Sequence, residues 1–183
     1  MTGPAVRTAT DADLTAITDI YAESVLNGLG TFELEPPDLA EMTRRMAEVR
    51  SRDLPLLVAE IDGVVAGYAY AGPFRLRRAY RYTVEDTVYV SPDHRGRGVG
   101  RALLNELVQR CEDRGLRQMV AVIGDSANEG SIAVHSACGF EHAGVFKAVG
   151  WKFEDWRDVV FMQRSLREGG DLPPTAEGMD IGI

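Results

Sequence analysis

A glycine-rich loop in the middle of the chain has the residue types of a ligand site. Its residues, in order, are Arg95, Gly96, Arg97, Gly98, Val99, Gly100 and Arg101. The loop lies between a strand-like and a helix-like segment, and a helix N-terminus exposes unpaired N–H groups and the positive end of the helix dipole. Glycines let an anion approach these groups without a Cβ in the way, and arginines add charge at the rim. The loop therefore predicts a phosphate site, with a glycine-rich turn and solvated arginines as the alternative.

Two common nucleotide-binding loops do not match this segment. The chain contains no GxxxxGK[ST] motif, which disfavours a P-loop nucleotide site. The glycine spacing also differs from GxGxxG, and the loop follows a mid-chain strand rather than the first one, which disfavours dinucleotide binding.

Glu85 is the second feature of the sequence that could take part in a reaction. It lies in the strand-like segment 83–90, which we expect to be mostly buried. A carboxylate is costly there unless it is used or paired. We therefore consider Glu85 as a general base, with an ion pair to a neighbour such as Arg81 as the alternative.

The histidines and cysteines carry weaker signals. His135 lies on a short predicted helix, where a histidine is more often packed and hydrogen-bonded than catalytic. His94 and His142 are expected in turns or at the surface. Cys111 and Cys138 are the two cysteines, expected to be buried and reduced, and Cys138 lacks a paired base that would make it a nucleophile. No cluster has metal-ligand spacing, so no metal is predicted.

The elements that position these residues follow from periodicity and capping signals. Alternation places Glu85 on one face of its strand and Asp86 on the other. Asp62-Gly63, between two apolar runs, predicts a hairpin. Helices are predicted from Thr10 to Gly28, from Asp38 with an apolar stripe that runs to Val49, from the loop to Gly115, and over 131–138; strands are predicted over 54–61, 64–71, 83–90, 118–123, 143–153 and 156–166.

These elements predict one domain with a mixed α/β sheet. The strand–helix–strand step over 83–123 favours a parallel pair, and the remaining strands can be antiparallel. The length of 183 residues suits a single domain, which we place at 1–166. Residues 167–183 are rich in Gly, Pro and acidic side chains, so we expect a flexible tail.

Composition narrows the class of partner. The net charge is −8 and the pI about 4.9, which disfavours nucleic acid. No apolar stretch approaches the ~20 residues of a membrane span, and the start lacks a secretory signal, so we expect a cytoplasmic protein. A local cluster of arginines nevertheless suits a small anionic ligand: Arg75, Arg77, Arg78 and Arg81.

Two spaced motifs resemble those of the GNAT acetyltransferase superfamily. One is Arg95-x-x-Gly98-x-Gly100 after a strand, and the other runs from Asn128 to Gly139-Phe140. The resemblance covers Val6 to about Leu166. Within the superfamily, the segments 83–91, 121–124 and 150–153 resemble the phosphinothricin/methionine sulfoximine N-acetyltransferase group. The resemblance to the superfamily implies a mostly antiparallel twisted sheet flanked by helices, with a parallel strand pair splayed around the cofactor.

The resemblance also implies a cosubstrate site for acetyl-coenzyme A. Backbone N–H groups from Gly96 to Arg101 would hold the pyrophosphate. Asn128 and Ser131 would line the channel. The pantetheine arm would pair with the strand through Val88, Tyr89 and Val90.

By the same resemblance, Glu85 is the base that receives the amine proton, directly or through water. His135 lies where many members carry a tyrosine that protonates the thiolate, and a backbone N–H near Val90 would stabilise the oxyanion. The substrate would be amino-acid-like, with its oxyanion bound by cationic side chains and its pocket walled by aromatic ones. The candidates are Arg75, Arg81, Lys152, Phe32, Tyr80 and Trp151.

Four alternatives stay open at this point. The amine could be another amino acid, a polyamine or a protein N-terminus. The chain could also bind acetyl-coenzyme A without turnover. The resemblance further implies a homodimer, with the ribbon after Ala143 as its seam.

Overall fold

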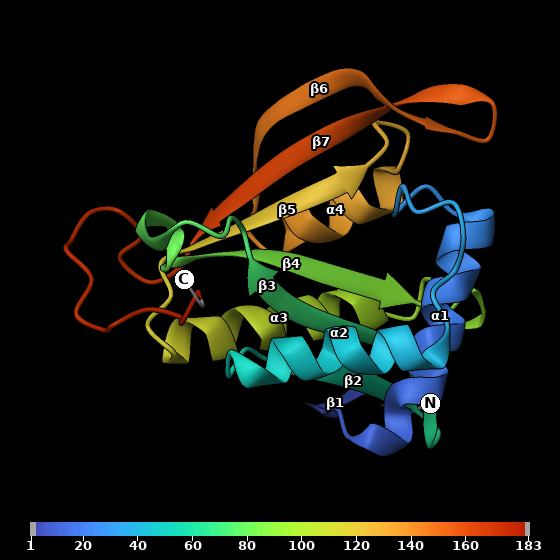
Figure 1. Ribbon diagram of the computed structural model, residues 1–183, viewed down its shortest axis with the longest axis horizontal. Helices are drawn as coiled ribbons and strands as arrows, with labels where there is room; N and C mark the ends of the chain where they lie inside the picture. The colour runs from blue at the N-terminus through green and yellow to red at the C-terminus, as the bar shows by residue number, and fades with distance from the viewer. Residues whose placement is uncertain (1–2, 182–183) are drawn as a thin grey trace.

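A computed structural model describes residues 3–181, which form one seven-stranded sheet with helices on both faces (Figure 1). The strand order is β1-β2-β3-β4-β5-β7-β6. The strands are β1 (Ala5–Thr8), β2 (Leu56–Ile61), β3 (Val64–Pro73), β4 (Thr83–Val90), β5 (Gln118–Gly124), β6 (Glu141–Lys152) and β7 (Asp155–Ser165). The α-helices are α1 (Leu14–Asn27), α2 (Leu39–Ser51), α3 (Val99–Asp113) and α4 (Glu129–Ala137).

The mixed sheet predicted from the sequence is confirmed. Strands β4 and β5 are parallel, and the other neighbouring strands of residues 3–181 pair antiparallel. The parallel pairing covers only Thr83–Asp86 against Gln118–Ala121. Beyond the Asp86–Ala121 pair the two strands separate. We call this point the β4–β5 fork.

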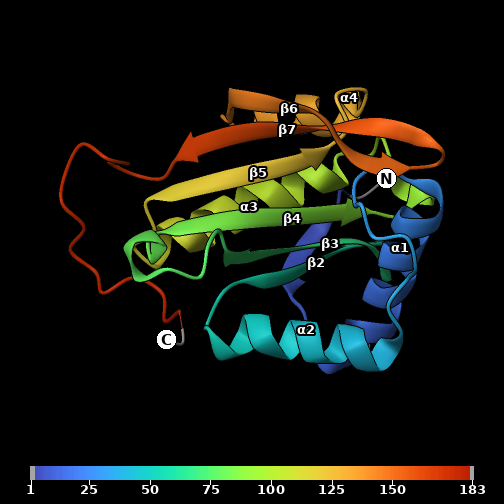
Figure 2. The same ribbon diagram turned by 45° about the horizontal axis from the view of Figure 1, so that its top comes forward.

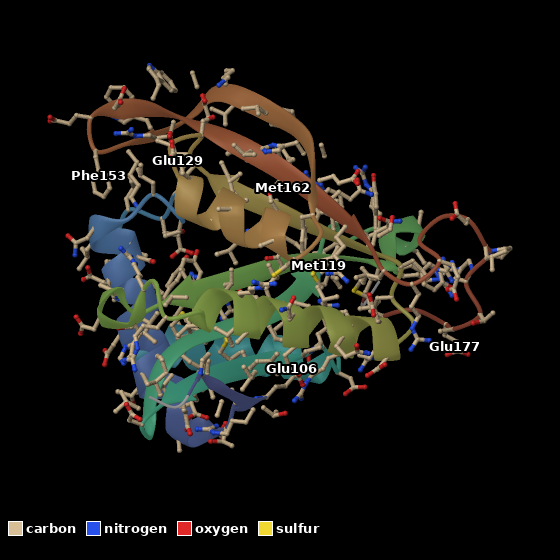
Figure 3. All side chains as sticks on the ribbon, turned by 180° about the vertical axis from the view of Figure 1, so that it is seen from behind. Glu106, Met119, Glu129, Phe153, Met162 and Glu177 are labelled. Atoms are coloured by element: carbon tan, nitrogen blue, oxygen red, sulfur yellow. The ribbon has the colours of Figure 1, made fainter. Side chains whose placement is uncertain are left out.

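Helices α1 and α2 cover one face of the sheet, and α3 and α4 lie on the other (Figure 2). Local signals explain where the helices begin. For example, the Asp38 carboxylate accepts a hydrogen bond from the Glu41 N–H at 2.8 Å and so caps α2. The core lies on both faces of the central strands, where Met119 of β5 and Met162 of β7 are fully buried (Figure 3).

One local element was predicted from the sequence and another was missed. The hairpin at Asp62-Gly63 is present, with φ of 52° and 79°, as its sequence predicts. Strand β1, in contrast, was not predicted, because its four residues are exposed at both ends and half-buried in the middle, a pattern without alternation. It is fixed by tertiary contacts: Arg7 donates to Asp13 of the first turn and to Glu60 of β2.

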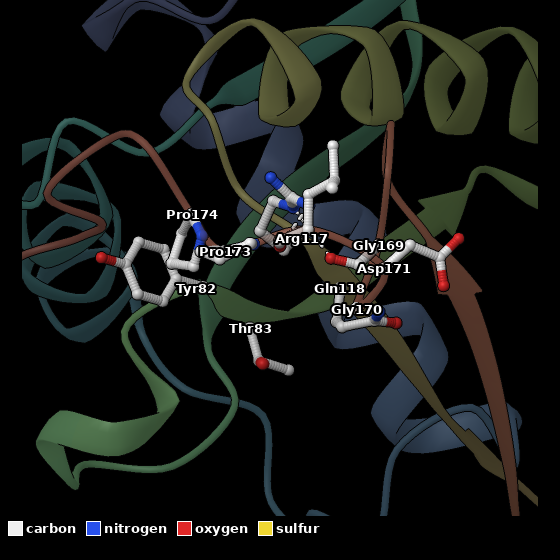
Figure 4. A pocket seen from close by; sticks show the side chains of 10 residues that line it. Tyr82, Thr83, Arg117, Gln118, Gly169, Gly170, Asp171, Pro173 and Pro174 are labelled. Atoms are coloured by element: carbon white, nitrogen blue, oxygen red, sulfur yellow. Dashed lines mark hydrogen bonds between the residues drawn. The ribbon is translucent and has the colours of Figure 1, made fainter.

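The described part of the C-terminal tail, 167–181, makes hydrogen bonds to the domain, and the flexibility expected for it stays a prediction. Arg117 donates from Nε to the Gly169 carbonyl at 2.8 Å and from Nη2 to the Leu172 carbonyl at 2.9 Å (Figure 4). The Met179 N–H donates to the Arg81 carbonyl at 2.8 Å. Two apolar side chains of this segment, Met179 and Ile181, are buried despite their polar surroundings. Residues 182–183 lie outside the described part.

Candidate active site

The glycine-rich loop leads directly into α3, as predicted. Gly96 and Gly98 have φ of 73° and 81°, a region that favours glycine, and Gly98 is the N-cap of α3. Within residues 3–181, no heavy atom lies within 4 Å of a Cβ built on either glycine. The two glycines therefore leave open space in front of α3, which suits the approach of a diphosphate to the start of the helix.

The arginines of the loop lie exposed at its rim. Arg95, Arg97 and Arg101 are all solvent-exposed. Arg97 Nη2 lies 3.9 Å from Asp62 Oδ2, in the hairpin turn between β2 and β3. Val99 and Gly100 form the floor: Val99 is buried, and a Cβ on Gly100 would meet Val90 and Val134 at ordinary contact distance.

Past the fork, β4 has one edge without a strand partner. Val88, Tyr89 and Val90 pair with Ala69, Tyr68 and Gly67 of β3 on one side. On the other side, within the described chain, β5 does not pair with them. An extended ligand could therefore add to this edge through main-chain hydrogen bonds.

The two residues predicted to line the cofactor channel build the start of α4. The Ser131 N–H donates to Asn128 Oδ1 at 3.2 Å, so Asn128 caps the helix. Asn128 Nδ2 in turn donates to the Gly124 carbonyl at 3.1 Å. Both side chains are half-buried beside the end of β5.

Glu85 lies on the α1/α2 face of the sheet, half-buried and without a hydrogen bond or ion pair among residues 3–181. Burial, with a contribution from the Asp86 charge, raises the pKa of Glu85 to about 7, and the Arg75 charge opposes that rise. A carboxyl group with this pKa is substantially ionised at neutral pH and still binds a proton readily. It suits a general base.

A row of tyrosines borders Glu85 on the same face. The rings of Tyr21 and Tyr89 are 5.1 Å apart, those of Tyr68 and Tyr89 are 5.6 Å apart, and Tyr70 stacks on Tyr68 at 6.4 Å. Burial raises the pKa of Tyr70, with a hydrogen bond from Thr87 opposing and the Glu85 charge adding. This row was not predicted, although the i, i+2 spacing of Tyr68 and Tyr70 on a strand was a usable signal.

The predicted substrate loop is fixed close to the ribbon of β6 and β7. A Cβ on Gly150 would come within 2.3 Å of the Phe32 ring, so Phe32 fits there only because residue 150 is glycine. Lys152 is buried, and its Nζ donates to the Thr31 carbonyl at 2.8 Å. The ammonium group of Lys152 thus holds the loop that carries Phe32. Burial lowers its pKa.

The arginine-rich connection, residues 74–82, carries three of the predicted substrate residues: Arg75, Tyr80 and Arg81. The Arg75 guanidinium lies 4.9 Å from the centroid of the Phe74 ring, and Tyr80 packs edge-on against that ring at 5.8 Å. Arg81 instead lies 4.6 Å over the Tyr82 ring and donates to the Arg78 carbonyl at 3.2 Å. The alternative pairing of Glu85 with Arg81 is therefore wrong.

Trp151, the remaining aromatic candidate, is 56% exposed and contacts Trp156 edge-on at 5.3 Å. Within one chain it therefore belongs to the outer surface of the ribbon rather than to a closed pocket wall.

His135 lies on the opposite face of β4, buried against Asp86. Its Nε2 is 2.9 Å from Asp86 Oδ2, and its Nδ1 is 2.7 Å from the Ser131 carbonyl. Burial by itself would lower the pKa of His135, but the hydrogen bond and charge of Asp86, together with the Ser131 carbonyl, raise it overall. Asp86 was not predicted as a site residue. Its position opposite Glu85 on the strand was the signal available.

The comparisons with known proteins agree with this geometry. Residues 15–140 match the acetyltransferase (GNAT) family. Phosphinothricin N-acetyltransferase of Alcaligenes faecalis is 53% identical over 169 residues, which cover 92% of this chain and 86% of the relative. L-methionine sulfoximine/L-methionine sulfone acetyltransferase of Salmonella typhimurium is 41% identical over 166 residues, which cover 89% and 95%.

Solved structures give the same result at the level of the fold. A GNAT superfamily phosphinothricin acetyltransferase from Sinorhizobium meliloti, in complex with AcCoA, matches with a TM-score of 0.94 and 49% identity, covering 100% of this chain and 98% of that one. The family match spans Glu85, the glycine-rich loop and His135. With a matching fold and relatives that align over nearly its whole length, this chain belongs to the GNAT acetyltransferase family.

Proposed function

We propose that this protein transfers an acetyl group from acetyl-coenzyme A to the primary amine of a small amino-acid-like substrate of the phosphinothricin or methionine sulfoximine type. The observation that carries the proposal is Glu85. Its carboxyl group, with a pKa raised to about 7, lies on β4 one residue before Asp86, whose pair with Ala121 is the last before the β4–β5 fork. The names of the similar proteins supply the substrate class.

The open features of the site suit acetyl-coenzyme A. The N–H groups between Gly96 and Arg101 can receive the pyrophosphate, because the two positive-φ glycines leave the helix start uncovered. The unpaired edge of β4 over 88–90 can receive the pantetheine arm. Asn128 and Ser131 border this path at the start of α4.

The chemistry is a direct attack in a ternary complex. Glu85 accepts a proton from the amine, directly or through water, because only a neutral amine has the lone pair that attacks the thioester. A backbone N–H near Val90 stabilises the oxyanion as the C–N bond forms. The C–S bond then breaks, and His135 donates a proton to the coenzyme A thiolate.

Recognition of the substrate falls to the groups around Glu85. Arg75 is the cation whose charge reaches Glu85, so we assign it to the carboxylate or phosphinate of the substrate. Phe32 and Tyr80 wall the pocket. Lys152 acts mainly through the Thr31 carbonyl, and Arg81 contributes charge from the edge of the connection.

We further propose a homodimer formed through the ribbon of β6 and β7. The ribbon carries a group of exposed large apolar side chains, and such groups mark association surfaces. They are Val145, Phe146, Val149, Trp151, Phe153 and Trp156. Phe153 lies at the far end of the ribbon (Figure 3).

We place the protein in the cytoplasm, because Cys111 and Cys138 are both free thiols.

A coenzyme A release assay across amino acids and their analogues tests the function. We expect turnover with phosphinothricin or methionine sulfoximine above that with polyamines or peptide N-termini. Preference for one of those amines would select that alternative. Tight acetyl-coenzyme A binding without release from any amine would favour a non-catalytic binding module.

A further inference from the structure

Residues 29–33, between α1 and α2, contact both strands beyond the β4–β5 fork, and we call them the cross-fork segment. On the β4 side, the Tyr89 hydroxyl donates a hydrogen bond to the Gly30 carbonyl at 3.2 Å. On the β5 side, a Cβ built on Gly124 would overlap the Leu29 carbonyl oxygen, so the segment lies directly against this glycine. The segment therefore bridges the two strands beyond the point at which their pairing ends.

These contacts lie on the sheet face that carries Glu85. Glu85 pairs with Val120 of β5, and the side chains of directly paired residues point to the same face. Tyr89 follows Glu85 by four residues, and an even spacing along a strand keeps the same face. Gly124 follows Val120 by four residues as well. The cross-fork segment is therefore on the Glu85 side of the fork.

Tyr70 of β3 is a common neighbour of Glu85 and the segment. Burial raises the pKa of the Tyr70 hydroxyl, and the charges of Glu85 and Glu33 add to the rise. Glu33 is the last residue of the cross-fork segment. Both carboxylates are thus within electrostatic reach of one ring, which places the end of the segment on the same part of the face as Glu85.

The Phe32 ring of the segment is held by two glycines from different strands, and we call this pair the glycine seat. A Cβ built on Gly150 of β6 would overlap the ring. A Cβ on Gly124 would lie 3.1 Å from Phe32 Cε1, closer than an ordinary van der Waals contact. Neither glycine has a positive φ, so alanine suits the backbone at both positions. Only the neighbouring atoms of the segment exclude a side chain there.

The hydrogen bonds of the segment depend on where this ring lies. Thr31 precedes Phe32, its carbonyl accepts from the buried Lys152 Nζ at 2.8 Å, and its hydroxyl is 3.0 Å from the Tyr21 hydroxyl. Displacement of the ring would pull Thr31 away from both partners and leave a buried ammonium group without its acceptor, which is costly. The glycine seat therefore fixes the polar contacts of the segment as well as its ring.

We propose that Gly124 and Gly150 are positioning residues for acetyl transfer: by seating Phe32, they fix the cross-fork segment as a wall of the amine site before the substrate binds. The inference rests on the proposed function. A segment that is already ordered spares the amine the entropy cost of ordering it, so the seat acts on amine binding.

The deciding variant is Gly150→Ala, because the added methyl group overlaps the Phe32 ring and forces it out of the seat. We expect kcat/KM for the amine to fall about tenfold, mainly through KM, with acetyl-coenzyme A affinity changed less than about twofold. Gly144→Ala, on the same strand, is the matched control. A Cβ on Gly144 meets no heavy atom of residues 3–181 within 4 Å, so this variant should keep wild-type kinetics.

Gly124→Ala should have the larger effect. Its methyl group meets the Leu29 carbonyl oxygen, a main-chain atom that cannot rotate away as a ring can. We expect a loss of more than about tenfold in kcat/KM for the amine. Wild-type kinetics in a folded Gly124→Ala protein would overturn the role of this glycine.

A double-mutant cycle with Phe32→Ala tests whether Gly150 acts through the ring. In the Phe32→Ala background the methyl group of Gly150→Ala enters space that the ring has left, so it should cause no further loss. Equal losses in both backgrounds would show that the methyl group acts independently of Phe32 and would overturn the proposal.

Hydrogen exchange of a peptide covering residues 28–35 measures the segment without turnover. Exchange should be faster in Gly150→Ala than in the wild type and unchanged in Gly144→Ala. Unchanged exchange in Gly150→Ala would show that the ring stays seated, which contradicts the proposal. Size-exclusion chromatography of the same proteins checks the ribbon of β6 and β7. A change of assembly in Gly150→Ala alone would assign its effect to the ribbon and overturn the seat.

The outcomes separate the two proposals. Wild-type kinetics in Gly150→Ala overturn the positioning role and leave the acetyltransferase function intact. A wild type that acetylates no amine overturns the proposed function, and the positioning role falls with it even when hydrogen exchange shows a seated ring.

Discussion

The two faces of β4 treat neighbouring carboxyl groups in opposite ways. Glu85 lies on the α1/α2 face, is half-buried and makes no hydrogen bond or ion pair among residues 3–181. Asp86, the next residue, lies on the α3/α4 face, is buried and pairs with His135. Strand alternation creates this difference, since adjacent side chains point to opposite sides of a sheet. The unpaired carboxyl group of Glu85 has a raised pKa because it is buried without a partner. The hydrogen bond and charge of Asp86 instead contribute to the raised pKa of His135.

The comparison is tested most strongly by Glu85→Gln. If Glu85 is the base of the α1/α2 face, the variant should lose about 100- to 1,000-fold in kcat while acetyl-coenzyme A affinity stays the same. Steady-state kinetics and calorimetry measure the two quantities. In the wild type, kcat/KM should rise with pH through about 7, where Glu85 loses its proton. Equal activity of variant and wild type would remove Glu85 from the mechanism.

The next largest effect is expected in the free energy of unfolding, which should respond differently to changes at Asp86 and at Glu85. Asp86→Ala leaves the buried His135 without its partner and should lower the free energy of unfolding by about 3 kcal/mol. Glu85→Gln should behave differently. The pKa of Glu85 is raised on folding. The stability that its protonated form contributes to the fold is therefore fully present below pH 4.5 and is lost as pH rises through about 7.

The matching observation is the unfolding free energy of Glu85→Gln at two pH values. Relative to the wild type, the variant should gain stability at pH 8 compared with pH 4.5. Denaturant titrations at both pH values give this difference. A loss at pH 8 as large as that of Asp86→Ala would mean that Glu85 is paired after all.

Arg75→Ala sharpens the description of the Glu85 face. Loss of this cation should lower kcat/KM about tenfold, the size expected for one charge-assisted hydrogen bond to the substrate. It should also move the acid limb of the profile to higher pH, because the Arg75 charge lowers the pKa of Glu85. Arg77→Ala, an exposed change in the same connection, is the control. Equal effects of the two variants would point to general electrostatics rather than a specific contact.

The smallest effect is expected for Lys152→Met. The variant loses the hydrogen bond to the Thr31 carbonyl, worth about 1 kcal/mol, but no longer buries an ammonium group. Its thermal stability should therefore change little, while the KM for the amine should rise a few-fold because the Phe32 loop is held less firmly. Lys147→Met, an exposed lysine of the same ribbon, provides the comparison. A tenfold or greater loss of kcat would show that Lys152 contacts the substrate directly.

Much of the fold could be predicted because its signals are local. The Asp62-Gly63 turn, the Asp38 cap and the glycines before α3 each act over a few residues, so the sequence identifies them directly. Strand β1 and the packing of 167–181 depend on partners far along the chain, such as Glu60 and Arg117. Neither periodicity nor composition contains that information.

The amino-acid sequence by itself determined the glycine-rich loop before α3, the strand with Glu85 and the likeness to the GNAT superfamily, because these depend on residue types at fixed spacing. Only the tertiary structure decided which partners those residues meet. It separated Arg81 from Glu85, assigned Lys152 to the Thr31 carbonyl and brought Asp86 to His135, 49 positions away in the chain. The physical reason is that hydrogen bonds and burial depend on distance in space, which one-dimensional spacing beyond a single element does not fix.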